Sequence, residues 1–228
     1  MVLDGQRARA DIFLTPVAKR MLNVNPNIIS WLGLIVALIS GVIFYFSGAD
    51  GKEWLLLVGA AAVIISGYFD ALDGKIAKLA GKCSKKGDYL DHVFDRFADV
   101  FMIGGIAICA YWCDPHLGML AIIGVLLTSY MGTQAQAIGA PRLYAGLLGR
   151  ADRVVLSTIF PIVQYVMMTY TDFGSFTLDL GFKVFDINWL EIMMLWYAIA
   201  GNFTAIQRAI VTWRNLNKME EEENQKKE

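Results

Sequence analysis

Four aspartates recur at helical spacing in a short stretch of an otherwise apolar chain. Asp70 and Asp73 are three residues apart, and Asp91 and Asp95 are four apart. Residues at these spacings share one face of a helix, and a short turn makes two successive helices antiparallel neighbours, so the two faces can meet. Four gathered carboxylates would repel one another and lose hydration unless cations neutralise them. The pattern therefore predicts a site for hard divalent ions such as Mg²⁺, Mn²⁺ or Ca²⁺, with Mg²⁺ or Mn²⁺ as the leading candidates.

Two glycines accompany these aspartates. Gly74 follows Asp73, and Gly87 lies four residues before Asp91. A glycine inside a helical pattern costs about 1 kcal/mol relative to alanine, and one reason to keep it is the close approach of a ligand to the backbone. Carboxylates, cations and an approachable backbone together indicate a bound diphosphate, which a pair of metal ions can position. Capping or solvation is the alternative interpretation for a single aspartate, and Asp88 is expected to cap the third span.

The surrounding sequence is typical of a membrane protein. The 228 residues are 56% hydrophobic and only 18% charged, and their mean hydropathy is +0.48. A soluble domain of this length rarely combines such values, and several apolar runs approach the roughly 20 residues that cross a bilayer as a helix. The expected fold is an all-α integral membrane protein with six transmembrane helices, near residues 28–48, 53–80, 88–113, 117–139, 151–171 and 188–215.

The two ends of the chain differ from this apolar centre. Residues 1–24 are predicted to form an amphipathic helix that lies on the membrane surface, and a helix packed on the bundle is the alternative. Residues 25–217 form the expected six-helix domain, and residues 218–228 form a charged tail that is expected to be frayed. Lys and Arg concentrate on one side of the predicted spans, which places both termini and the aspartates in the cytoplasm of a multi-pass protein of the cell membrane.

A long, gapped motif runs through the acidic stretch. It reads Asp70-x2-Asp73-Gly74-x2-Ala77-Lys78-x8-Gly87-x3-Asp91-x3-Asp95. This motif resembles the signature of the CDP-alcohol phosphotransferases, which are integral membrane enzymes of phospholipid synthesis. Residues 25–34, 149–153 and 206–214 also resemble elements of that family. One position departs from the family pattern, because Lys78 stands where arginine is usual, and lysine keeps the charge but loses the bidentate fork.

The resemblance implies a reaction and a set of roles. A phosphatidyl or archaetidyl group would pass from a CDP-linked lipid to an alcohol, with release of CMP. Asp95 would act as the general base, and two divalent cations would be held by Asp70, Asp73, Asp91 and Asp95. The residues implied to contact the nucleotide or its diphosphate are Asn27, Asp73, Gly74, Ala77, Lys78 and Gly87. The resemblance also implies a homodimer in the lipid bilayer, and no nucleic-acid partner is expected.

Three arginines near the ends of the last two spans concern the acceptor. Arg150, Arg153 and Arg208 are predicted to bind the phosphate of a phosphorylated polyol, because arginine inside a span is costly and indicates function. Their arrangement resembles the family branch that uses myo-inositol phosphate, which is the leading acceptor. That branch usually has basic residues in the fourth span, where this chain has Gly132 and Gln134. Glycerol phosphate is therefore the alternative acceptor, and residues 132–137 resemble archaeal members, which use ether lipids.

Two other function classes are compatible with an acidic cluster. A divalent-cation transporter could use it, but the aspartates are expected at the membrane rim, whereas transporter sites tend to lie near the midplane between two repeated halves. A membrane scaffold with an incidental cation site is the other class. Release of CMP that depends on both an acceptor and a metal ion would separate the enzyme from these two.

Overall fold

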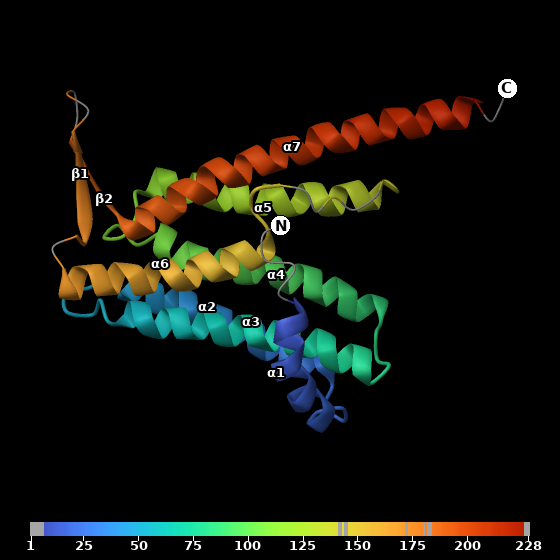
Figure 1. Ribbon diagram of the computed structural model, residues 1–228, viewed down its shortest axis with the longest axis horizontal. Helices are drawn as coiled ribbons and strands as arrows, with labels where there is room; N and C mark the ends of the chain where they lie inside the picture. The colour runs from blue at the N-terminus through green and yellow to red at the C-terminus, as the bar shows by residue number, and fades with distance from the viewer. Residues whose placement is uncertain are drawn as a thin grey trace.

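The computed structural model describes residues 7–140, 143, 146–171, 173–179, 181 and 184–225. Over these residues the chain forms a helical bundle with one β-hairpin (Figure 1). The elements in chain order are α1 (Arg7–Arg20), α2 (Pro26–Phe46), α3 (Leu55–Leu79), α4 (Lys85–Ala107), α5 (Pro115–Ala137), α6 (Arg150–Tyr170), β1 (Ser175–Asp179), β2 (Val184–Asn188) and α7 (Trp189–Gln225). Residues 1–6 and 226–228 of the predicted terminal segments lie outside the described residues.

Five of these helices, α2, α3, α5, α6 and α7, are long and apolar enough to cross a membrane. The helix α4 has a similar length, 23 residues, but it carries the second half of the acidic motif. Its charged residues are Lys85, Lys86, Asp88, Asp91, Asp95, Arg96 and Asp99. The six-helix arrangement that the sequence predicts therefore contains five apolar helices and one helix that combines an apolar end with a charged end.

The bundle brings together helices that are distant in sequence. The helix α2 packs along α3 and α4, α5 packs along α7, and α6 packs against α3 and α7. The main core joins α2, α4 and α7 through fully buried side chains such as Phe44, Ile103 and Tyr197. The turn between α3 and α4 lies at one end of the bundle, and the β-hairpin lies at the opposite end (Figure 1).

The helices α2 and α4 touch through their backbones. A Cβ atom added to Gly105 would lie only 2.0 Å from the carbonyl oxygen of Gly41, and one added to Gly41 would lie 2.1 Å from that of Phe101. Small residues permit this kind of close helix approach in membrane bundles. The contact therefore fixes α4, and the aspartates that it carries, against α2.

The boundaries of α4 differ from the predicted span over residues 88–113. The helix begins at Lys85, because the Ser84 side chain accepts a hydrogen bond from the Gly87 backbone N–H at 3.0 Å and so caps it. The expectation that Asp88 is the cap is wrong, since Asp88 lies in the first turn. The helix ends at Ala107, six residues before the predicted limit.

The last helix also differs from the prediction. The helix α7 continues to Gln225, whereas the sequence suggested an end near residue 215 and a frayed tail. Glu, Lys, Gln and Met are all good helix formers, so the charged tail can extend the helix without burial. In Figure 1 this extension projects beyond the bundle at the end where α3 and α4 are joined.

The helix α1 packs on the bundle, as the alternative interpretation of residues 1–24 had it. Leu14 and Ala18 are buried against Leu72 and Ile76 of α3. After α1, the carbonyl oxygen of Leu22 accepts a hydrogen bond from the Lys82 ammonium group at 2.8 Å. A position of α1 on the membrane surface remains a prediction, because this packing is compatible with it.

Candidate functional site

Three of the four motif aspartates lie together. Asp70 of α3 and Asp91 and Asp95 of α4 each offer a carboxylate oxygen, and these oxygens all lie within 4.8 Å of one another. Asp70 and Asp91 are half-buried, and Asp95 is buried. Carboxylate oxygens are the ligands that hard divalent ions prefer. The donor set and its spacing therefore fit a divalent cation that contacts both helices.

The fourth motif aspartate has a different partner. Asp73 is buried and accepts a hydrogen bond from the Ser30 hydroxyl of α2. It is not among the three grouped ligands, although it lines a small cleft that Asp70 and Asp91 also line. The predicted set of four ligands is thus observed as a group of three, with the fourth carboxylate directed toward α2.

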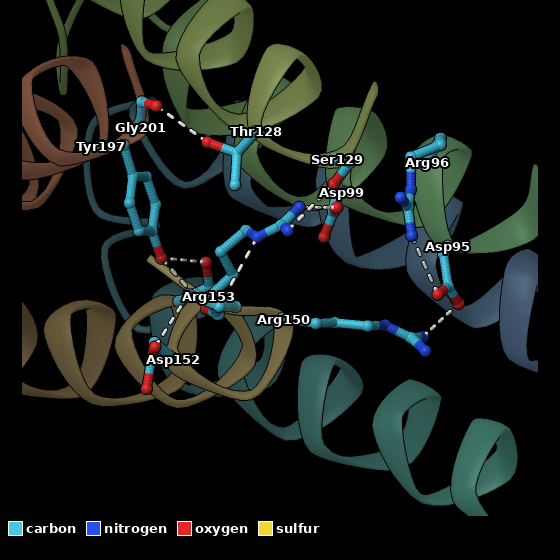
Figure 2. Close-up of polar contacts among 12 residues, drawn as sticks. Asp95, Arg96, Asp99, Thr128, Ser129, Arg150, Asp152, Arg153, Tyr197 and Gly201 are labelled. Carbon is cyan, nitrogen blue, oxygen red and sulfur yellow. Dashed lines mark hydrogen bonds and ion pairs between the residues drawn. The ribbon is translucent and has the colours of Figure 1, made fainter. Parts of the chain in front are cut away.

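Arg150, the first residue of α6, contacts two of the three grouped aspartates. Its Nη2 atom lies 2.7 Å from Asp70 Oδ1 and 2.6 Å from Asp95 Oδ1. Figure 2 shows Arg150 and Arg96 approaching the Asp95 carboxylate from different sides. The residue predicted to bind an acceptor phosphate therefore also ties α6 to the acidic group.

Arg153 has little surface available for a ligand. It is only 4% exposed and forms an ion pair with Asp99, which is 2% exposed. Its Nη2 atom donates to the Ser129 hydroxyl at 3.0 Å, and the Tyr197 hydroxyl donates to its backbone carbonyl at 3.0 Å (Figure 2). The geometry thus makes Arg153 a link between α4, α5, α6 and α7.

The third predicted acceptor arginine lies against α5. Arg208 of α7 donates from Nη1 to the backbone carbonyl of Thr128 at 2.5 Å. A Cβ atom added to Gly132 would lie 3.3 Å from the same Nη1 atom, so the missing side chain makes room for the guanidinium. Gly132 stands where the related branch usually has a basic residue, and Arg208 of α7 supplies a basic group at the same place.

A single cavity of about 760 Å³ joins these groups. One part of its lining is charged and contains three aspartates and four arginines, namely Asp70, Asp91, Asp95, Arg96, Arg150, Arg153 and Arg208. Another part is formed by small and apolar residues of α3 and α6, including Ile64, Gly67, Val155 and Ile159. The cavity can therefore hold a molecule that has an anionic end and an apolar end.

The residues implied to contact the nucleotide lie near the ends of α2, α3 and α4. A Cβ atom added to Gly74 would meet no atom within 4 Å, and the Lys78 side chain is exposed. A Cβ atom added to Gly87 would lie 3.9 Å from Asn27 Oδ1, so the starts of α2 and α4 meet there. Ala77 is half-buried in the last turns of α3. None of these residues is part of the lining of the large cavity.

Sequence reasoning missed three residues of this region. Ser30 and Ser129 contact a motif aspartate and a predicted acceptor arginine across 43 and 24 residues of sequence. Such partners leave no local signal in the sequence. Arg96 does leave one, because it is a charged residue directly after Asp95 in a helix whose following part is apolar.

The sequence matches the model of one protein family and is similar to the sequences of named enzymes. Residues 23–204 match the family described as CDP-alcohol phosphatidyltransferase. An archaetidylinositol phosphate synthase of Pyrococcus horikoshii is 31% identical over 147 residues, which cover 64% of this chain and 73% of that protein. A phosphatidylinositol phosphate synthase of Cutibacterium acnes is 27% identical, over 93% of this chain and 98% of the relative.

The fold is also found in a solved structure. A crystal structure of the Mycobacterium tuberculosis phosphatidylinositol phosphate synthase with CDP-DAG bound superposes with a TM-score of 0.68 at 24% identity, and it covers 88% of this chain and 93% of that one. The same protein in complex with manganese and citrate gives the same TM-score over 88% of each chain. At this identity the likeness shows the common fold.

Proposed function

Because the chain belongs to the CDP-alcohol phosphatidyltransferase family, we propose that it transfers a phosphatidyl or archaetidyl group from a CDP-linked lipid to a phosphorylated polyol and releases CMP. The leading acceptor is myo-inositol phosphate, because two relatives that align over 93% and 90% of the chain are named as a phosphatidylinositol and an archaetidylinositol phosphate synthase. The observation that carries the proposal is the single cavity in which three carboxylates, four arginines and an apolar wall meet.

Asp95 is the proposed general base of this reaction. The acceptor hydroxyl attacks the lipid-side phosphorus of the diphosphate, the bond from that phosphorus to the oxygen of CMP breaks, and Asp95 takes the hydroxyl proton. Asp70, Asp91 and Asp95 would hold the divalent cations, two ions of Mg²⁺ or Mn²⁺, with Asp73 as a further candidate ligand. Such cations, when bound, neutralise charge on the diphosphate.

The remaining residues divide the binding of the two substrates. We assign the acceptor phosphate to Arg150 and Arg208, which line the cavity from α6 and α7. Arg153 supports them by holding α6 in place through Asp99. The exposed backbone at Gly74 and the neighbouring Lys78 suit the cytidine diphosphate, as does Asn27 beside Gly87.

We also propose that the protein is a multi-pass enzyme of the cell membrane. We infer six spans, with α4 as the sixth beside the five apolar helices. The α3–α4 turn, both termini and the cavity's charged part would face the cytoplasm, and α1 would lie at that membrane surface. A homodimer is a further expectation from the family resemblance.

Transfer assays test this proposal directly. The purified protein would be given a radiolabelled CDP-diacylglycerol or CDP-archaeol, Mg²⁺ or Mn²⁺, and either myo-inositol phosphate, glycerol phosphate or unphosphorylated inositol. We expect CMP release that requires the metal and myo-inositol phosphate and that stops when EDTA is added. Faster turnover with glycerol phosphate would overturn the acceptor assignment. No CMP release with any acceptor would overturn the enzyme itself.

A further inference from the structure

Arg96 occupies a position in the cavity that helix geometry alone does not impose. Its Nη2 atom lies 3.1 Å from Asp95 Oδ2, although the two residues are consecutive in α4. Consecutive residues of a helix do not face each other. The contact therefore requires the long Arg96 side chain to bend back toward Asp95. Arg96 lines the same cavity as Arg150 and Arg208.

The guanidinium of Arg96 has a donor without a partner among the residues that the structure describes. An arginine carries five N–H donors. Within the described residues, Nη2 contacts Asp95, while Nε is buried without a hydrogen-bond partner. A buried donor that lacks a partner costs folding free energy. A charged side chain in a helix that enters a membrane indicates function, and the later part of α4 is apolar. These observations indicate that a ligand in the cavity accepts from Arg96.

The charges around Arg96 specify the kind of ligand. Arg153 is compensated by Asp99, and Arg150 lies between Asp70 and Asp95. The three grouped carboxylates are also the fitted ligands of divalent cations, so cation binding would leave the cavity arginines with excess positive charge. A phosphate group is the matching anion, since its oxygens accept several guanidinium N–H groups.

We infer that Arg96 is a further acceptor-site residue: one N–H group holds the Asp95 carboxylate, and the others bind the phosphate of the acceptor. This inference rests on the proposed function. It follows from the size of the acceptor, because the phosphate and the reacting hydroxyl belong to one small polyol. The side chain that binds the phosphate must therefore lie within one such molecule of the base, and Arg96 contacts that base directly.

Kinetics of Arg96→Gln and Arg96→Lys test the inference. We expect Arg96→Gln to raise the KM for myo-inositol phosphate about tenfold or more, because charged hydrogen bonds are lost, and to lower kcat. Binding of the CDP-lipid, measured without acceptor, should change less than about twofold, and Arg96→Lys should recover part of the acceptor affinity. Arg214→Gln is the matched control, because Arg214 is exposed near the far end of α7 and does not line the cavity. A purely structural role would not separate the two substrates in this way.

Two results would overturn the inference. One is an unchanged acceptor KM in Arg96→Gln, and the other is an equal loss of CDP-lipid binding. If Arg96→Gln does not fold, the conservative Arg96→Lys still reports an altered acceptor KM. If the wild-type enzyme releases no CMP, the proposed function fails, but calorimetric titration with inorganic phosphate still tests Arg96. Weaker phosphate binding by Arg96→Gln would then support the inference, and equal binding would contradict it.

Discussion

Two buried aspartates of the same motif have different surroundings, and this difference separates their roles. The oxygens of Asp95 face Arg150 Nη2 at 2.6 Å and Arg96 Nη2 at 3.1 Å inside the cavity. Asp73 instead accepts a hydrogen bond from Ser30 of α2. One carboxylate thus lies in the lining of the cavity, and the other joins two helices.

The substitutions Asp95→Asn and Asp73→Asn should therefore differ in effect. Asparagine keeps the shape of the side chain but cannot take a proton, so Asp95→Asn should lower kcat by about 10²- to 10⁴-fold. An amide oxygen at position 73 can still accept from Ser30, so we expect a loss there of less than about tenfold. Initial rates of CMP release, with thermal unfolding as the fold control, measure both. Turnover by Asp95→Asn near the wild-type rate would reject the base assignment.

Arg153, which lines the cavity, is held by its buried ion pair with Asp99. Removing one partner of a buried ion pair leaves an uncompensated charge, so Asp99→Asn should lower stability by about 3–5 kcal/mol. Replacing both residues, as Asp99→Leu with Arg153→Met, should recover much of that loss because no charge is left unpaired. Thermal unfolding in detergent compares the variants. A double variant that is less stable than Asp99→Asn would contradict this account.

The sequence could predict part of this residue-scale picture. The four-residue spacing of Asp91 and Asp95 places both on one face of α4, and both contribute to the ligand group. The position of Asp73 could not be predicted, because its partner Ser30 is 43 residues away. The contact of Arg208 with Thr128 spans 80 residues and likewise depends on how α5 and α7 pack.

At the scale of helices, the positions of the helices could be predicted from the sequence better than their ends. Apolar runs of about 20 residues predicted the positions of the helices, because their length must match the bilayer. Their ends followed local chemistry that was missed, such as the Ser84 cap of α4. The predicted spans left the residues of β1 and β2 in a connection, since a short hairpin has no apolar core that the sequence could reveal.

The site depends on the backbone contact between α2 and α4, and adjacent glycines in α4 offer a matched test of this contact. In Gly105→Ala the new Cβ atom would lie 2.0 Å from the Gly41 carbonyl oxygen, so α2 and α4 must separate. In Gly104→Ala the nearest atom would be Ile122 Cδ1 at 4.0 Å, and alanine is the better helix former by about 1 kcal/mol. We expect Gly105→Ala to lower the melting temperature and activity, and Gly104→Ala to preserve both. Equal behaviour of the two variants would show that the close approach is unimportant.

At the scale of the whole molecule, the bundle has two chemically distinct ends. The α3–α4 turn lies at the end with the acidic group and contains the exposed Cys83. Cys109 and Cys113 lie beyond α4 near the opposite end and are buried. Burial, with the nearby Glu191 carboxylate as a lesser cause, raises the pKa of the Cys113 thiol to about 12. The thiolate is the reactive form, so Cys113 stays inert at ordinary pH.

These cysteines allow the orientation to be measured without introducing a new cysteine. A membrane-impermeant maleimide at pH 7.5 should modify Cys83 in vesicles whose cytoplasmic face is outward and should leave right-side-out vesicles unlabelled. Cys83→Ser should remove the signal, because the buried thiols do not react. Labelling of Cys83 from the extracytoplasmic side would show that the proposed orientation is inverted.

The cavity's apolar wall has a consequence for how a lipid would reach it. Ile64 of α3 and Ile159 of α6 belong to that wall, and each residue is about half exposed. If these helices span the bilayer, a lipid substrate can enter the cavity laterally between them while its acyl or alkyl chains stay in the hydrocarbon core. Lifting those tails into water would cost about 0.8 kcal/mol for each methylene group, and sideways entry avoids that cost. The length of the lipid chains should then have little effect on turnover. The product would stay in the leaflet in which it forms.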